Sequence, residues 1–307
     1  MIIASAIGSY TLLFIFFSSA IQNTVAFSQV HQKSHSTSPR RCDSLGIPSL
    51  LLLASLDRDV VGDDKTDMKN DASVTGVTLK MAFDSSRDWG VADLSETKSE
   101  RFTSPDSLDM VHRLRRESCA VLVGRGTVEQ DDCTLTVRRV SLSDGKRQPV
   151  RVVIDPSLSL LGGNYTILND RLPTIVYHLQ TKSVVTASND HVILVGIEPS
   201  DNECAGKSFI SPSAVVKDLD ARGFRHVMVE GGPATARAFL KAGIVDRAIL
   251  VRAPFKFEKP MPAMMNESTL ELAGLQMIGT AVLGGDRIEY WTRNGLAWPD
   301  QQLQMWP

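Results

Sequence analysis

Cysteine is scarce in this sequence, and the residue pairs that build a zinc site are missing. The 307 residues contain four cysteines and no H-x-E or C-x-x-C pattern. This excludes a zinc-dependent deaminase, which needs histidine and cysteine ligands beside a glutamate, and no metal site is expected. Cys42 lies near the N-terminus, and Cys119, Cys133 and Cys204 are too widely spaced to suggest a disulfide framework, so we expect ordinary thiols.

Two glycine-rich nucleotide motifs are incomplete. Gly124-Arg-Gly126 follows an apolar stretch, but Glu129 occupies the place of the third glycine in a G-x-G-x-x-G fingerprint. Gly206-Lys-Ser208 lacks the first glycine of a P-loop, because Asp201 stands there. These absences exclude the standard dinucleotide fingerprint and a P-loop NTPase.

Charge and hydropathy give no reason to expect a nucleic acid or a membrane as partner. The net charge is −2, and the hydrophobic fraction of 43% is ordinary for a globular protein. The apolar run from Leu12 to Phe17 is short for a membrane span, which needs about 20 residues. We therefore expect neither a nucleic acid nor, for the mature protein, a membrane as partner.

The first 73 residues differ in composition from the rest. Residues 1–26 hold the apolar run and small residues before Phe27, which predicts a signal peptide. Residues 27–73 are basic and serine-rich, with no acid before Asp43, as in a transit peptide, and end in an acidic, polar linker. Together they resemble the two-part leader of algae with complex plastids, so we expect a plastid location. Plain secretion is the alternative.

The remaining chain alternates apolar strands with helices. Helices are expected from Pro105, from Pro212 to Arg222 and from Ala234 to Leu240. Strands are expected at 77–83, 120–124, 151–155, 174–178, 191–196, 227–229, 245–251, 276–282 and 287–293. This order predicts an α/β fold with a mostly parallel sheet, helices on both faces and an antiparallel C-terminal hairpin that turns at Gly284–Asp286. We expect the folded domain at 74–295 and a tail at 296–307.

A strand, a glycine corner and a helix start meet in H-V-M-V-E-G-G-P, residues 226–233. Gly231 and Gly232 have no side chain, so a phosphate can approach the backbone, and the start of the next helix favours an anion. Glu230 ends the strand, which is the usual ligand position in an open α/β sheet. The residues alone leave open whether this is a nucleotide site or a tight turn.

A second polar group follows the strand at 120–124. Residues 124–138, G-R-G-T-V-E-Q-D-D-C-T-L-T-V-R, contain two adjacent carboxylates, hydroxyls and an arginine near the strand end. Carboxylates accept hydrogen bonds from sugar hydroxyls, and arginine binds phosphate through two parallel donors. The segment indicates a site for a phosphorylated, polyhydroxylated ligand, although a solvated loop with an aspartate cap explains the same residues.

Six ordered motifs give the chain a family resemblance. They are L-K-M-A (79–82), F-T-S-P (102–105), L-R-R-E-S (114–118), V-G-R-G-T-V-E-Q-D-D-C-T-L-T-V-R (123–138), Q-P-V-R-V-V-I-D (148–155) and V-E-G-G-P (229–233). The set resembles the riboflavin-biosynthesis reductase domain, the C-terminal half of the bacterial bifunctional deaminase-reductase. The resemblance covers about Val77 to Arg293 and implies a dihydrofolate-reductase-like fold and a homodimer.

The resemblance implies an NADPH-dependent oxidoreductase of riboflavin biosynthesis. The expected reaction reduces 5-amino-6-(5-phosphoribosylamino)uracil to the ribitylamino compound: hydride reaches C1′ of the ribose, and the ring oxygen leaves as a hydroxyl. Three alternatives stay open. They are a reductase of the same fold that acts on the diamino pyrimidine, one that acts on a pteridine, and a nucleotide-binding homologue without activity.

The resemblance also assigns site residues by motif. Asp131 and Glu230 are candidates for assisting proton transfer, and Arg115 and Arg138 are candidates for binding the substrate phosphate. Substrate contacts are implied for Ser99, Arg115, Leu135, Arg138 and Glu230. Contacts with NADPH are implied for Ala82, Arg101, Thr127, Asp131, Pro156, Gly231, Gly232, Pro233, Ala234, Thr235, Ala236, Arg237 and Ala238.

The chain departs from the family pattern at three places. The family's S-L-D-G after the first strand is replaced by F-D-S-S-R-D-W-G, Arg101 occupies a position that is often tryptophan, and Cys133 replaces the proline of D-D-P. All three lie near the expected cofactor and substrate entrance, so we expect them to bear on specificity.

Overall fold

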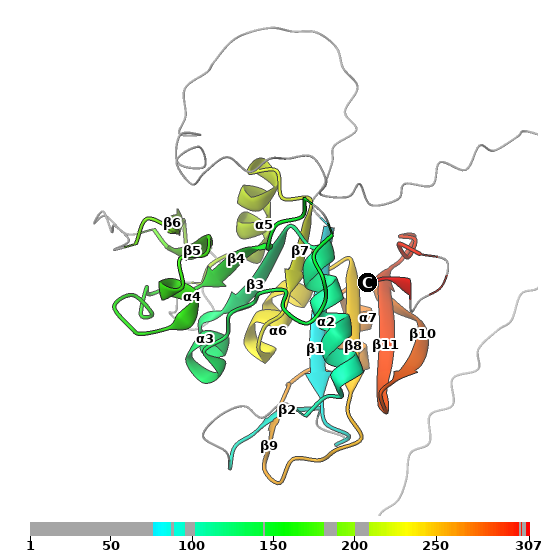
Figure 1. The fold of residues 1–307 in the computed structure, drawn as a ribbon. Helices are drawn as coiled ribbons and strands as arrows, with labels where there is room; N and C mark the ends of the chain where they lie inside the picture. The colour runs from blue at the N-terminus through cyan, green and yellow to red at the C-terminus, as the bar shows by residue number, and fades with distance from the viewer. Residues whose placement is uncertain are drawn as a thin grey trace, which may run out of the picture. The chain divides into compact units, whose positions relative to one another are not determined.

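The strands form one large sheet and a small two-stranded one. The computed structural model describes residues 76–86, 89–95, 102–143, 145–180, 189–199, 209–300, 302 and 305–307, which belong to one compact unit, Pro39–Pro307. In this part of the chain, nine strands form a sheet in the order β10-β11-β8-β1-β7-β3-β4-β5-β6 (Figure 1). They are β1 (Gly76–Phe83), β3 (Ala120–Gly124), β4 (Val150–Ile154), β5 (Thr174–Leu179), β6 (Val192–Ile197), β7 (His226–Val229), β8 (Arg247–Arg252), β10 (Leu275–Leu283) and β11 (Asp286–Arg293).

The expected mostly parallel sheet with an antiparallel C-terminal hairpin is confirmed. From β8 to β6 every neighbouring pair is parallel, whereas β11 runs antiparallel to both β8 and β10. The four residues 120–123 of the central strand β3 are 0% exposed, as expected of a parallel strand covered on both faces. Gly284 and Gly285 turn the hairpin with φ angles of 59° and 96°, which glycine adopts without strain.

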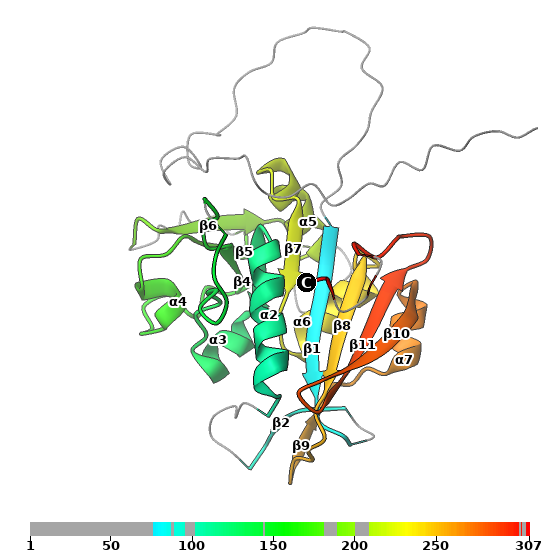
Figure 2. The ribbon, with the colours of Figure 1, turned by 45° about the vertical axis from the view of Figure 1, so that its right-hand side comes forward.

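Helices cover both faces of the sheet, as the alternation along β3 requires (Figure 2). Val121 and Val123 share a core cluster with side chains of α2, α3 and α4, whereas Ala120 and Leu122 share the other cluster with α5, α6 and α7. The helices are α2 (Pro105–Glu117), α3 (Arg125–Asp131), α4 (Thr166–Asn169), α5 (Pro212–Ala221), α6 (Pro233–Lys241) and α7 (Glu267–Leu272). None of the helices within the described ranges is long and apolar enough to cross a membrane.

Several short elements were not expected. The strands β2 (Gly90–Asp93) and β9 (Pro260–Pro262) form a separate antiparallel pair, and α3, α4 and α7 are helices of four to seven residues. Such elements are too short to show a period, and the Pro-Met-Pro sequence of β9 argues against a strand.

The prediction that the cysteines are ordinary thiols is wrong for Cys119, which is disulfide-bonded, whereas Cys133 is a free thiol. The predicted leader lies outside the described residues.

The C-terminal hairpin fixes the start of α2. The hydroxyl of Ser104 caps the helix by accepting from the Ser107 N–H and donates to the carbonyl of Leu283. The Ser104 N–H donates to the Asp286 carboxylate at 2.8 Å. A Cβ on Gly284 would lie 2.5 Å from the Ser104 hydroxyl, so this turn needs glycine for space as well as for φ. The last two strands therefore position the helix that carries part of the site.

A buried arginine joins β4 to α4. Arg151 is 1% exposed, and its guanidinium donates to both carboxylate oxygens of Asp170 at 2.6 and 2.7 Å. It also donates to the carbonyls of Ile167 and Leu172 and to the Thr174 hydroxyl. Such a pair depends on both partners, because removal of one leaves buried polar groups unpaired.

We expect Arg151→Met to lower the free energy of unfolding by about 3–5 kcal/mol, because several acceptors lose one shared donor. The matched control is Arg225→Gln, since Arg225 pairs with Asp220 where both side chains are exposed, and such pairs contribute at most about 1 kcal/mol. Urea unfolding measures both variants. Equal, small losses would show that the buried cluster does not stabilise the fold.

Candidate active site

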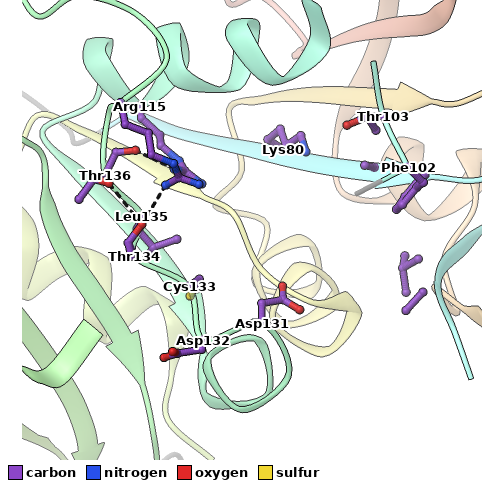
Figure 3. Close-up of a pocket in the computed structure, with 14 residues that line it drawn as sticks. Lys80, Phe102, Thr103, Arg115, Asp131, Asp132, Cys133, Thr134, Leu135 and Thr136 are labelled. Carbon is purple, nitrogen blue, oxygen red and sulfur yellow. Dashed lines mark hydrogen bonds between the residues drawn. The ribbon is translucent and has the colours of Figure 1, made fainter. Parts of the chain in front are cut away.

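A pocket of about 560 Å³ lies beside β1, on the face of the sheet that carries α2 (Figure 3). Its walls come from β1, β2, the segment before α2, α2 itself, the last residue of α3 and the segment that follows α3. The lining residues are Lys80, Ala82, Val91, Ala92, Phe102, Thr103, Arg115, Asp131, Asp132, Cys133, Thr134, Leu135, Thr136 and Arg138. Five residues that the sequence assigned to the site (Ala82, Arg115, Asp131, Leu135 and Arg138) therefore meet in one cavity. Ser99 and Arg101 lie outside the described residues.

Lys80 is the functional candidate that sequence reasoning missed. It lies two residues before Ala82 on β1, so both side chains point to the pocket face. Burial lowers the pKa of its ammonium, the Glu230 carboxylate opposes that shift, and the Arg115 guanidinium adds to it. A lysine whose pKa is lowered in a cleft is a candidate for proton transfer. The available signal was that Lys80 is the single charged residue of the strand G-V-T-L-K-M-A-F.

Arg115 and Glu230 form an ion pair at the back of the pocket. The Nε and one Nη of Arg115 donate to the two carboxylate oxygens at 2.9 Å each, and the other Nη donates to the carbonyl of Thr136 at 2.9 Å. The side chains are only 11% and 15% exposed. The exposed Arg138, whose guanidinium donates to the Thr134 hydroxyl at 2.9 Å, is more accessible to a substrate phosphate than the buried Arg115.

One row of α2 side chains holds the segment after α3. Asp109, His112 and Arg115 lie three residues apart, so they share one face of the helix. Asp109 accepts from the Arg139 side chain, and Nδ1 of His112 accepts from the Arg138 backbone N–H at 3.0 Å. Together with the bond from Arg115 to Thr136, these contacts fix the backbone from which Arg138 projects.

The two adjacent aspartates have different surroundings. Asp132 has a φ of 41°, and its carboxylate accepts from the N–H and the hydroxyl of Thr166 at 2.7 Å each, so it joins this segment to α4. Asp131 ends α3 and is exposed toward the pocket.

Two further residues of this segment are held within the protein. Leu135 is buried with a φ of 54°. Burial raises the pKa of the Cys133 thiol to about 12, which disfavours the reactive thiolate.

The glycine corner follows β7 directly after Glu230, which pairs with Arg115 but is not itself among the residues that line the pocket. The Gly232 N–H donates to the Thr127 hydroxyl at 3.0 Å, which ties the corner to α3. A Cβ on Gly231 would lie 2.9 Å from Cβ of Thr235, so close packing requires glycine there. The first turn of α6 begins at Pro233 and contains no acidic residue. This corner fits the phosphates of a dinucleotide, because the start of an uncapped helix attracts anions.

The other predicted cofactor residues differ in their surroundings. Ala234 and Thr235 lie in the first turn of α6, at the corner, whereas Ala236 is buried in the core. Arg237 donates to the carbonyl of Ala263, and Ala238 is exposed one turn further along α6. Pro156 follows β4 and accepts the Leu179 N–H through its carbonyl. Only the first turn of α6 therefore adjoins the corner closely.

Comparison with known proteins identifies the family. The model of the RibD C-terminal domain matches residues 77–282. The chain belongs to this family. It is 35% identical over 178 residues to the riboflavin biosynthesis protein RibD of Aquifex aeolicus, covering 58% of this chain and 46% of that protein. The chain thus spans about half the length of this bacterial relative.

An archaeal relative is shorter. The chain is 31% identical to the 2,5-diamino-6-ribosylamino-4(3H)-pyrimidinone 5′-phosphate reductase of Methanothermobacter thermautotrophicus, over 52% of this chain and 69% of that protein. The crystal structure of a deaminase/5-amino-6-(5-phosphoribosylamino)uracil reductase from Thermotoga maritima shares the fold. It gives a TM-score of 0.56 and 24% identity, over 72% of this chain and 57% of that one.

His112 gives a test of the α2 row. Burial, with help from Arg115 and Arg138, lowers the pKa of its imidazole from 6.5 to about 4. Between these values the unfolded chain binds a proton that the folded chain does not, so this histidine makes stability fall as pH falls from 6.5 to about 4.

His112→Asn keeps an acceptor near the position of Nδ1 but does not titrate. We expect its free energy of unfolding to fall less than that of the wild type across this pH range, as measured by urea unfolding at a series of pH values. His112→Ala, which leaves the Arg138 N–H unpaired, should lose about 1–3 kcal/mol already at neutral pH. Parallel pH curves for wild type and His112→Asn would contradict the assignment.

Proposed function

We propose that this chain uses NADPH to reduce 5-amino-6-(5-phosphoribosylamino)uracil to the ribitylamino compound. Lys80 carries the proposal: a half-buried lysine with a lowered pKa lies in a pocket beside the Glu230–Arg115 pair, and Arg138 lies in the wall of the same pocket. Membership of the RibD C-terminal domain family supports this choice of substrate.

The cofactor's phosphates would lie on Gly231, Gly232 and the first turn of α6. Thr127, which holds the Gly232 N–H, and the pocket residues Ala82 and Asp131 would hold the rest of the cofactor. When bound, NADPH supplies the hydride that C1′ of the ribose accepts. The residues of the chain have to supply orientation, exclusion of water and a proton.

The proton is needed on the ring oxygen of the ribose. When the bond between C1′ and this oxygen breaks, the electron pair stays on oxygen, which must be protonated to become a hydroxyl. The Lys80 ammonium is the donor that the pocket offers, because a lowered pKa makes it a stronger acid. Glu230 lies close enough to act on the charge of Lys80, and Asp131 on the exposed side of the pocket remains the second candidate for proton transfer.

The diamino pyrimidine is the second candidate substrate. It is favoured by the archaeal relatives, two of which are named for reduction of the diamino compound at 31% identity. The two pyrimidines differ only in the group that deamination changes, whereas the phosphate and the reacting ribose are the same. The site residues described above serve either substrate.

The deciding experiment incubates the purified chain with NADPH and each pyrimidine in turn. Loss of NADPH absorbance, together with a product two mass units heavier, supports the reductase, and the ratio of kcat/KM values identifies the preferred pyrimidine. Binding of NADPH without turnover on either substrate would reject the proposed activity. Failure to bind NADPH would also reject the cofactor site at the glycine corner.

Lys80 and Arg138 should affect different kinetic constants. We expect Lys80→Met to lower kcat by about 10²- to 10⁴-fold, the usual contribution of a general acid, with little change in KM. Arg138→Ala should mainly raise KM for the pyrimidine, by about 10- to 100-fold, because it removes a charged partner of the phosphate. Steady-state kinetics measure both. A similar effect of the two substitutions on both constants would contradict these separate roles.

A further inference from the structure

The tail segment, residues 296–307, packs beside α2 on the same face of the sheet. Trp298 and Trp306 lie against the core cluster that contains apolar side chains of α2, β8 and β11. The centres of their rings are 5.3 Å apart, and the ring of Trp298 is 5.4 Å from that of Tyr290 on β11. The tail follows residue 282, where the match to the family model ends. It is therefore a feature of this chain beyond the matched domain.

Two arginines from different elements donate to the backbone of the tail. Nε of Arg113 on α2 donates to the carbonyl of Pro307 at 3.1 Å, and one Nη of Arg247 on β8 donates to the carbonyl of Ala297 at 3.0 Å. The guanidinium of Arg247 also lies over the ring of Trp306, 5.8 Å from its centre, where a cation is attracted to the indole. The tail is thus bound near both of its ends, and Figure 2 shows its last residues next to α2.

Trp306 also reaches the carboxyl end of α2 through a buried histidine. Its ring centre lies 5.7 Å from that of His226 on β7. Nδ1 of His226 donates to the carbonyl of Glu117, the last residue of α2, at 3.1 Å, and Nε2 is hydrogen-bonded to the Thr78 hydroxyl of β1 at 2.9 Å. Trp306 therefore packs on the side chain that joins α2 to two central strands.

The tail and the segment after α3 hold α2 from opposite sides. Arg113 and Arg115 are two residues apart, so their side chains point about 200° apart in a helix of 3.6 residues per turn. Arg115 binds Glu230 and the Thr136 carbonyl on one side, and Arg113 binds the tail on the other. Leu114 between them is 0% exposed and packs on the sheet. Apolar contacts of this kind let a helix slide by small amounts, so loss of the tail contacts would let α2 shift and carry Arg115 with it.

We propose that the tail segment is a strap that positions α2 for catalysis, with Trp306 and Arg113 as its positioning residues. This inference rests on the pocket of the proposed function. Neither residue is among the described residues that line the pocket, so both act through the Arg115–Glu230 pair. The charges of this pair act on Lys80. A displaced pair therefore changes the rate of the reaction and its pH dependence together.

Kinetics at a temperature where every variant is folded test the strap. We expect Trp306→Ala to lower kcat by about 10- to 100-fold, the cost of a misplacement of about 1 Å, and to shift the pH at which kcat is half-maximal. Arg113→Met should change both in the same direction, and Trp306→Phe, which keeps a ring on His226, should restore most of kcat. The matched control is Met305→Ala, because Met305 precedes Trp306 and is 67% exposed. A wild-type kcat and pH profile in folded Trp306→Ala and Arg113→Met would overturn the strap.

Hydrogen exchange tests the strap without turnover. In Trp306→Ala we expect the amides of α2 to exchange faster than in the wild type, whereas those of α5, on the other face of the sheet, keep their rates. Equal acceleration in both helices would show a general loss of stability and overturn the positioning role, as would unchanged exchange in α2. A wild type that reduces neither pyrimidine rejects the proposed function, and faster exchange confined to α2 would then retain the strap.

Discussion

The site depends on the paired charges of Arg115 and Glu230. One belongs to α2 and the other ends β7, so the pair joins the helix to the central sheet, and the bond from Arg115 to the Thr136 carbonyl adds the segment after α3. A buried pair of this kind contributes little net stability, because desolvation offsets its attraction. Its effect is positional: three elements that are distant in sequence keep one geometry around Lys80.

The C-terminal hairpin helps to position the site, because it contacts the start of α2. Ser104, at its start, is held by Asp286 and by the Leu283 carbonyl, and the row of Asp109, His112 and Arg115 follows along the helix. The hairpin formed by β10 and β11 comes after the other described strands in sequence. It lies at one edge of the sheet, outside the parallel part. β10 and β11 therefore help to position the α2 wall of the pocket, although none of their residues lines it.

Much of the fold could be predicted from the sequence because the long strands carry continuous apolar runs. Residues 120–124 are apolar up to Gly124, and residues 150–154 are apolar except for Arg151. The Ser-Pro pairs at the starts of α2 and α5 do supply the expected N-caps, because Ser104 and Ser211 accept from backbone N–H groups of their helices. The short helices were not predicted, because four to seven residues are too few to show a helical period of apolar residues. Lys80 was missed for another reason: in a strand covered on both faces, the residue pattern does not say which side chain meets a cavity and which meets a helix.

The pairing of Arg115 also shows the limit of motif transfer. The motif names residues that gather around a ligand, but it does not say which of them hold each other; only the fold shows that Arg115 is engaged by Glu230 and that Asp132 is engaged by Thr166. Asp131 and Arg138 line the pocket as well, and Arg138 donates to the Thr134 hydroxyl at 2.9 Å.

The altered loop after β1 acts on the pocket through its wall. Asp84 is buried, and its carboxylate accepts the N–H groups of Gly90 and Phe257 at 2.9 and 3.1 Å, which pins β2 beside the pocket. Trp89 packs against Phe83 and, 4.0 Å away, the guanidinium of Arg252, on the face opposite Lys80. The described residues of this loop thus pack behind the sheet and hold β2 in position.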